Sequence, residues 1–398
     1  MLERFVIDIE NVKSHSSKIL NAVLECLSRN QNELVYVIGS WQSGDFGHIY
    51  AAAVRHFSEK RKPMPLGILI FSLKSEIPIS LLNDIQFALG PISEHGKINL
   101  FTTTPLDKKD NLIIAMGEIE RRGFAVSPYR ATFIAESLVK NMKQGQPLTP
   151  VWADIARQQG GISYEAYTKI CNSFMQDYID RFGKSSGREK FVCMWARNVP
   201  LIGGANPQYN SSEDGNEQLC LNLKHVIPDI KAIFIVGDGF NASTKKIPHV
   251  FDLGKFWEIA KGQIDGRFQE NGFFDYMTAF YDCDVVHVGM KSGGMDVLGL
   301  WGQKVVFIDT VNSHEVTKGR VAAWSTKNLT SVEVDELPTK FGKEIDIARA
   351  IGKISIGTTI SIPKKVEIEN FASSACSDNM FNNDDLSKIA RAVQRMFI

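Results

Sequence analysis

The chain lacks paired cysteines, a net charge and any long apolar run. Its six cysteines are scattered without a CxxC pair, which predicts reduced, mostly buried thiols and neither zinc nor disulfides. Lys plus Arg equals Asp plus Glu, 45 of each, so nothing argues for a nucleic-acid or membrane-surface partner. No run approaches the ~20 apolar residues of a transmembrane helix, and the first residues lack the apolar segment of a signal peptide. These absences predict a cytoplasmic protein.

The length of 398 residues is too great for one compact core, so we expect two domains. Strand-like and helix-like segments alternate in the first half. Strands are expected at 4–9, 34–38, 66–71 and 98–101, and helices at 16–27, 49–60, 79–88, 112–121, 131–142 and, as two helices broken at 160–161, over 150–182. This alternation is typical of a doubly wound α/β domain.

The same alternation restarts after Gly183–Gly187, a polar, glycine-containing stretch that suits a linker. Strands are expected at 191–195, 232–236, 285–288, 305–308, 331–334 and 353–361, and helices at 217–225, 256–261, 295–301 and 384–396. The predicted fold class is therefore α/β, with two tandem doubly wound (Rossmann-like) domains. We place the first domain at 1–185 and the second at 186–383, followed by a C-terminal helix at 384–398.

The segment from Asp284 to Asp309 predicts a strand, a loop of small residues, a helix and a second strand. The loop is Lys291-Ser292-Gly293-Gly294, and Ser292 can cap the helix that follows. The amides of Gly293, Gly294 and Met295 would then be unpaired in the first turn, where they and the helix dipole favour an anion such as phosphate. Lys291 adds a positive charge. The alternative is that these glycines only form a tight turn.

Two further loops follow predicted strands. In the first half, the strand at 34–38 runs into Gly39–His48, which contains Ser43, Gly44 and Asp45 and leads into a helix. In the second half, the strand at 191–195 ends in Ala196-Arg197. Gly237-Asp238 follows the strand at 232–236 and could approach a nucleoside, or could simply form a turn.

Two similar α/β domains, a central linker and a final helix together resemble the GT-B glycosyltransferase fold. In that family the C-terminal domain holds the nucleotide-sugar, the N-terminal domain holds the acceptor across a cleft, and the final helix usually crosses back to the first domain. The resemblance covers essentially the whole chain as architecture. It implies the same arrangement here, with the C-terminal helix returning to the first domain.

Three local matches carry this resemblance. The loop at 291–296, with the helix that ends at Gly302, looks like the diphosphate-binding turn of heptosyltransferase-like and fucosyltransferase-like members. Arg197 resembles the strand-end arginine that fucosyltransferases set against the pyrophosphate. Asp45, after Gly44, is similar to the catalytic aspartate in the glycine-aspartate turn of heptosyltransferases. The chain has neither the threonine-glycine pair of the heptosyltransferase nucleotide loop nor the fucosyltransferase HxR triplet, so the donor stays open.

The chemistry of sugar transfer fits these residue types. The diphosphate that leaves must be stabilised where its charge develops, which an arginine fork and helix amides can do without a metal. Arg197 would supply this fork, unless it is an interdomain or surface ion-pair residue. An acceptor must lose a proton to a carboxylate or histidine. Asp45 and His48, three residues apart, can share one helix face, although Asp45 could equally be an N-cap.

Other side chains admit a functional interpretation, but a structural one is favoured. Asp282-Cys283-Asp284 matches the DxD metal motif, yet it lies where a helix meets a buried strand, so turn and cap roles are favoured. We interpret His287, Trp195 and Trp301 as core residues, and Asp296 as a favourable charge in a first helical turn. A pair of acidic residues, Glu213-Asp214, lies in the predicted loop at 199–214, where it would touch the sugar or be solvated.

The sequence therefore predicts a metal-independent enzyme, a hexosyl- or deoxyhexosyl-transferase, that uses a nucleotide-diphosphate sugar and a glycan or protein acceptor. We expect no cofactor beyond that donor. The main alternative is a non-catalytic nucleotide- or sugar-binding protein of the same fold, which would need no base. A dehydrogenase is disfavoured, because the loop Gly39–His48 lacks GxGxxG spacing.

Overall fold

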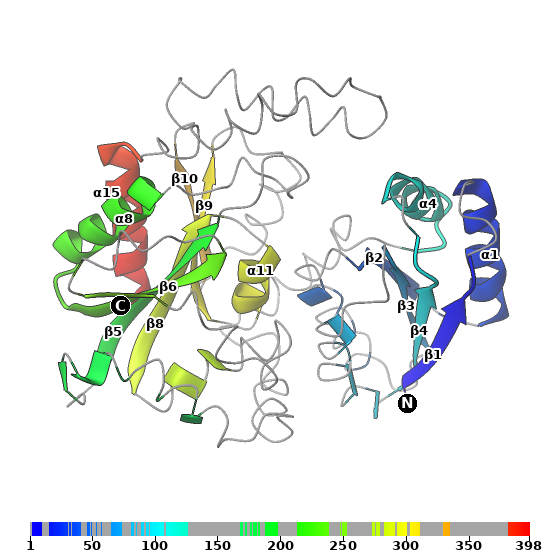
Figure 1. The fold of residues 1–398 in the computed structure, drawn as a ribbon, viewed down its shortest axis with the longest axis horizontal. Helices are drawn as coiled ribbons and strands as arrows, with labels where there is room; N and C mark the ends of the chain where they lie inside the picture. Colours follow the sequence, from blue (N-terminus) through cyan, green and yellow to red (C-terminus); the bar gives the residue numbers. More distant parts are fainter. Residues whose placement is uncertain are drawn as a thin grey trace. The chain divides into compact units, whose positions relative to one another are not determined.

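The computed structural model describes residues 2–9, 16–30, 32, 34–40, 46–47, 49, 53, 57, 65–73, 81–82, 85, 89–90, 93–94, 96–106, 109–125, 168–169, 172, 176, 178–180, 182–183, 188–197, 213–238, 247, 249–252, 273–274, 276–278, 282–290, 293–300, 303–310, 329–334 and 381–398. These residues divide into two compact units, one formed by those before and one by those after position 163. Each unit is an α/β structure built on a parallel sheet (Figure 1). The α/β class predicted from the sequence is confirmed.

The described strands of the first unit form a four-stranded parallel sheet in the order β1-β4-β3-β2. Its strands are β1 (Leu2–Ile7), β2 (Leu34–Gly39), β3 (Leu66–Phe71) and β4 (Ile98–Thr103). Every residue of β3 and β4 is buried, as expected for central parallel strands covered on both faces. The apolar run of β3 predicted that strand at its observed bounds, whereas β4 was predicted without its last two residues, which are threonines.

Two helices cover one face of this first sheet. In α1 (Ser16–Arg29) the buried residues Ile19, Leu20, Val23 and Leu27 recur at helical spacing. They share a hydrophobic core with Phe71, Phe101 and residues of α4 (Lys109–Arg121), which packs beside α1. The described positions within the predicted helices at 49–60 and 79–88 are also helical.

The described strands of the second unit form a six-stranded parallel sheet in the order β10-β9-β8-β5-β6-β7. They are β5 (Glu189–Arg197), β6 (Ile230–Asp238), β7 (Val250–Asp252), β8 (Cys283–Met290), β9 (Lys304–Thr310) and β10 (Leu329–Val334). Counted within this unit, β7-β6-β5-β8-β9-β10 is the order 3-2-1-4-5-6. That is the doubly wound order of Rossmann domains.

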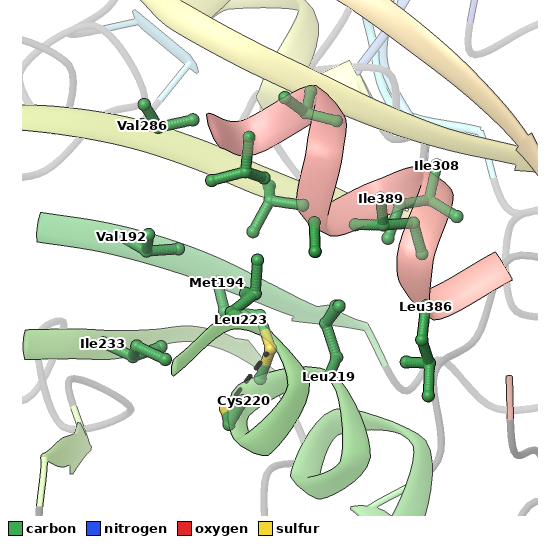
Figure 2. Close-up of a cluster of buried hydrophobic side chains, with 14 of the residues drawn as sticks. Val192, Met194, Leu219, Cys220, Leu223, Ile233, Val286, Ile308, Leu386 and Ile389 are labelled. Atoms are coloured by element: carbon green, nitrogen blue, oxygen red, sulfur yellow. Dashed lines mark hydrogen bonds between the residues drawn. The ribbon is translucent and has the colours of Figure 1, made fainter. Parts of the chain in front are cut away.

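The two faces of the second sheet bury different helices. On one face, Val192, Met194 and Ile233 pack against α8 (Glu213–Val226) and α15 (Asn383–Met396), as Figure 2 shows. The helix α11 (Gly293–Leu300) lies on the other face (Figure 1). An α-carbon substituent at Gly299 would lie 2.1 Å from Leu329 Cδ1, so this glycine allows close contact between helix and sheet.

The C-terminal helix α15 is an element of the second unit. The side chain of its N-cap, Asn382, accepts a hydrogen bond from the Asp385 amide at 2.8 Å, and Leu386 and Ile389 join the core under the sheet. The amphipathic helix predicted at 384–396 is confirmed. Its return to the first domain stays a prediction.

Two features of the structure differ from the sequence predictions, and several predicted segments are not tested by it. Glu213 and Asp214 begin α8 and do not belong to a loop, because acidic residues in a first turn are stabilised by the helix dipole. The three-residue strand β7 was missed, because so short a run carries no period. The predicted linker after Gly183, the helices at 131–142, 150–160 and 256–261, and the strand at 353–361 lie outside the described residues.

Candidate functional site at the carboxyl edge of the second sheet

The strand order of the second unit changes direction between β5 and β8. From β5 the chain proceeds outward to β6 and β7, and it then returns to β8 and proceeds the other way to β9 and β10. The helices that follow neighbouring strands on either side of this point therefore diverge. In open parallel sheets, ligands bind outside the carboxyl ends of the strands at such a switch point.

Three of the predicted binding segments reach this edge on adjacent strands. Arg197 is the last residue of β5, and its Cα is in register with that of Asp238, the last residue of β6. On the other side of β5, Trp195 is in register with Gly289, one residue before the end of β8. Gly293 begins α11 three residues after β8 ends. The fold thus brings together residues that lie up to 96 positions apart between Arg197 and Gly293.

Two glycines allow the neighbouring strands to approach the end of β5. A Cβ at Gly289 would lie 2.7 Å from both Cβ and the carbonyl oxygen of Trp195. A Cβ at Gly237 would lie 2.0 Å from the carbonyl oxygen of Ala196, and Gly237 also has a φ of +126°. Gly289 directly follows the strand predicted at 285–288 and was given no role in the predicted site. Its position two residues before the loop of small residues was the available signal.

The first turn of α11 contains four of the predicted residues, Gly293, Gly294, Met295 and Asp296. Gly294 is partly exposed, whereas the side chains of Met295 and Asp296 are fully buried. Met295 can therefore contribute its backbone amide, as predicted, while its side chain belongs to the core. The predicted Lys291 and Ser292 lie outside the described residues.

Behind the switch point, Trp195 and His287 form a buried hydrogen bond. The indole Nε1–H of Trp195 donates to Nδ1 of His287 at 3.1 Å, and Phe274 packs against both rings. Burial lowers the pKa of His287 to about 3, while the neighbouring Gln303 side chain acts in the opposite sense. Both aromatic residues are core side chains, as predicted, and a neutral, fully enclosed imidazole is not available as a general base.

Hydroxyl groups close the corresponding edge of the first sheet. Thr104 Oγ1 accepts from the Ile9 amide at 2.8 Å, and Thr103 Oγ1 accepts from the Ser72 amide at 2.9 Å. Ser40 Oγ accepts from the Leu73 amide at 3.1 Å. These contacts continue the pairing of the strands beyond the ladder and fix the carboxyl ends of β1 to β4.

The predicted acceptor-side residues follow this hydroxyl-lined edge in the sequence. Ser43, Gly44, Asp45 and His48 lie outside the described residues, but Phe46, Gly47 and Ile49 are helical and buried. Ile49 confirms the helix expected at 49–60, whereas Phe46 and Gly47, which were predicted in the loop, are helical as well. The catalytic roles of Asp45 and His48 and the predicted cleft between the domains stay predictions.

The DxD motif lies at the opposite end of the second sheet from the switch point. Asp284 is the second residue of β8, roughly 20 Å from its carboxyl end at 3.3 Å per residue. Lys304 Nζ lies 2.8 Å from both of its carboxylate oxygens, and Asp282 has a φ of 46° in the preceding turn. The position and the ion pair favour the structural role that the sequence analysis gave this motif.

The described cysteines and other potential metal ligands form neither an activated thiol nor a metal-ligand cluster. The described cysteines, Cys26, Cys193, Cys220 and Cys283, are free thiols, and the last three are buried, as the sequence analysis predicted. Burial raises the pKa of Cys283 to about 12, so its thiol is not an activated nucleophile. Within the described ranges, no three His, Cys, Asp or Glu side chains gather as metal ligands. No helix in the same ranges is long and apolar enough to cross a membrane.

Comparison with known proteins leaves the chain without an assigned family. No protein-family model matches it, and no curated protein matches its sequence. Among solved structures, a variant of the wall teichoic acid polymerase TagF is similar over 96% of this chain and 92% of its own, with 7% identity and a TM-score of 0.24. The same variant soaked with CDPG gives 8% identity over 97% and 98%, with a TM-score of 0.22. TM-scores this low do not establish a shared fold, so the fold assignment depends on the strand order.

Proposed function

We propose that the protein is a metal-independent glycosyltransferase of the GT-B type that uses a nucleotide-diphosphate sugar. One observation carries this proposal. The 3-2-1-4-5-6 strand order puts the end of β5, with Arg197, beside the end of β8 and the start of α11. An arginine and a helix N-terminus at one switch point are the groups that a departing diphosphate requires.

Each group has a distinct role in the proposed reaction. Arg197 binds phosphate oxygens of the donor with its guanidinium fork, a geometry that a lysine does not reproduce. The amides of Gly293, Gly294 and Met295 accept the charge that develops on the leaving diphosphate, with Lys291 and Ser292 completing the loop. Gly237 and Asp238 lie on the nucleoside side of this diphosphate. Asp296, buried in the first turn, is proposed to hold the helix start in place.

The acceptor is activated, in this proposal, by the first unit. Asp45 removes the proton of an acceptor hydroxyl or amide on a glycan or protein, and His48 is the second candidate for this role. Ser43 and Gly44 form the turn that presents Asp45. The bond from the sugar to the diphosphate breaks as the bond to the acceptor forms, and the proton passes to the carboxylate.

A thermal-shift screen against UDP-, GDP-, ADP- and dTDP-sugars tests the proposal first. A donor present at ~100 times its Kd should stabilise the protein by roughly 2.7 kcal/mol. The donor that stabilises is then incubated with the protein, and released nucleoside diphosphate is measured with and without candidate acceptors. Stabilisation without any turnover would support the alternative, a non-catalytic nucleotide- or sugar-binding protein. The absence of any stabilisation would contradict both.

A further inference from the structure

Asp238 occupies a distinctive position in the second sheet. It is the last residue of β6, the second strand of the 3-2-1-4-5-6 order, and its Cα is in register with that of Arg197 on β5. The next strand outward, β7, ends lower in the sheet, since its last residue, Asp252, is in register with Ile235. Asp238 thus lies at the carboxyl edge, one strand away from the switch point.

The backbone holds this position closely against β5. Gly237 has a φ of +126°, and a Cβ there would lie 2.0 Å from the Ala196 carbonyl oxygen. Residues with a side chain rarely adopt that φ, and the contact leaves no room for one. The close approach of Gly237 to β5 therefore fixes the position of the Cα of Asp238, the next residue, beside the end of β5.

The spacing across the edge matches the length of a nucleotide. From β8 to β5 to β6 is two strand spacings, or about 10 Å. A ribonucleoside diphosphate that places its terminal phosphate at the start of α11 and its first phosphate at Arg197 would extend its ribose toward the end of β6. In dinucleotide-binding Rossmann domains, an acidic residue that follows the first βα turn accepts a hydrogen bond from the ribose 2′-hydroxyl.

We propose that Asp238 recognises the ribose diol of the donor, so that the protein selects ribonucleotides over 2′-deoxyribonucleotides. This inference rests on the proposed function, because it assumes a nucleotide diphosphate at the same edge. It goes further in naming the class of donor, which excludes dTDP-sugars as preferred substrates. A carboxylate that accepts from both the 2′- and 3′-hydroxyls loses one of two hydrogen bonds when the 2′-hydroxyl is absent.

The test compares pairs of nucleotides that differ only at the 2′ position. UDP, GDP, CDP and ADP and their 2′-deoxy forms are titrated into the full-length protein by calorimetry. For the base that binds, we expect the ribose form to bind about 10- to 100-fold more tightly, the usual range for a hydrogen bond to a charged group. This ratio in the unmodified protein requires no variant to fold, and equal binding of the two forms would overturn the inference.

The variant Asp238→Asn then assigns the preference to this side chain. Removing a negative charge near phosphates strengthens both forms alike, so the ratio of the two affinities isolates the contact with the 2′-hydroxyl. We expect the ratio to fall to a few-fold. The matched control is Asp229→Asn, since Asp229 is exposed just before β6 at the other end of the strand and pairs with Lys190 at 2.6 Å. The control should keep the ratio of the parent.

The outcomes separate the inference from the function on which it rests. If the parent binds no nucleoside diphosphate, the proposed function fails and the inference fails with it. If a nucleotide binds and Asp238→Asn shifts both affinities equally, the diphosphate site stands, but Asp238 acts only through its charge and does not recognise ribose. A ratio that falls in Asp238→Asn and not in Asp229→Asn supports the inference.

Discussion

Trp195 on β5 donates a hydrogen bond from its indole to the imidazole of His287 on β8, across the strand pair where the sheet changes direction. The contact is possible because β8 has a glycine, Gly289, directly beside Trp195. Both rings are buried, so the hydrogen bond is shielded from water. This pair fixes the two strands whose carboxyl ends frame the proposed diphosphate site.

Gly289→Ala should destabilise the protein by about 1–3 kcal/mol, because the added methyl overlaps the backbone and Cβ of Trp195 and the strands must separate. Urea unfolding followed by circular dichroism measures this change. The control is Gly117→Ala in α4, where a Cβ meets nothing within 4 Å. That substitution should instead stabilise the helix by about 0.5–1 kcal/mol. Equal stability of Gly289→Ala and the parent would show that the strand spacing does not depend on this glycine.

His287 should make the stability of the second unit sensitive to acid. Its pKa falls from 6.5 to about 3 on folding, because burial disfavours the charged imidazole. Below pH 6.5 the unfolded chain binds a proton that the folded chain does not, so stability falls as the pH drops from 6.5 toward 3. Between pH 7 and pH 5 this loss is about 2 kcal/mol.

The variant His287→Gln tests this sign, because its amide can still accept from the Trp195 indole but does not titrate. Its free energy of unfolding should be lower than that of the parent at pH 7 and should change less between pH 7 and pH 5. His225→Gln is the control, since His225 is exposed on α8. If the free energy of unfolding of His287→Gln changed with pH as much as that of the parent, this histidine would not contribute to the acid sensitivity.

Arg197→Ala should weaken nucleotide-sugar binding and slow transfer together, because the proposed contact exists in both the ground state and the transition state. Loss of one such contact should cost about 2–4 kcal/mol in transition-state stabilisation. Arg197→Lys should recover only part of it, since lysine keeps the charge and loses the fork. Donor titration and single-turnover rates measure both effects. Arg29→Ala, an exposed arginine of α1 in the first unit, is the control and should behave as the parent does.

Asp45→Asn should leave donor affinity nearly intact while the chemical step falls by about 10² to 10⁴, if Asp45 is the base. Asparagine keeps the shape of the side chain and can still cap a helix, so an effect on folding is disfavoured. Circular dichroism shows whether the variant is folded, and donor titration shows whether it binds the nucleotide-sugar. Its single-turnover rate is then measured. Transfer at the parent rate would reduce Asp45 to a helix cap and make His48 the next residue to test.

Turnover should survive EDTA, because the proposed site neutralises the leaving diphosphate with Arg197 and helix amides. The DxD aspartate Asp284 is already paired with Lys304, away from the switch point. Activity is measured after dialysis against the chelator and again after manganese is added. Complete loss with restoration by manganese would contradict the proposal and return attention to Asp282 and Asp284.

Most strands and helices were predictable because their signals are local. The apolar run of β3, the valines of β8 and the helical spacing of Leu386, Ile389 and Val393 in α15 are visible in the sequence alone. The three-residue β7 and the early start of α8 at Glu213 were not, because a short run has no period and helix starts depend on caps. Ser43–Asp45, Lys291 and Ser292 are predicted from loop composition, which carries no information on which loops lie together in the fold.

By itself, the sequence determined which segments alternate between strand and helix, and it therefore fixed the α/β class and the presence of glycines and an arginine after strands. The tertiary structure decided which of these strands are neighbours. Arg197 and Asp238 are 41 residues apart, yet their Cα atoms are in register, because β6 pairs with β5. Hydrogen bonding between strands depends on the whole sheet, so no local pattern encodes that β8 returns to the other side of β5. That return creates the switch point, and with it the need for Gly289 beside Trp195.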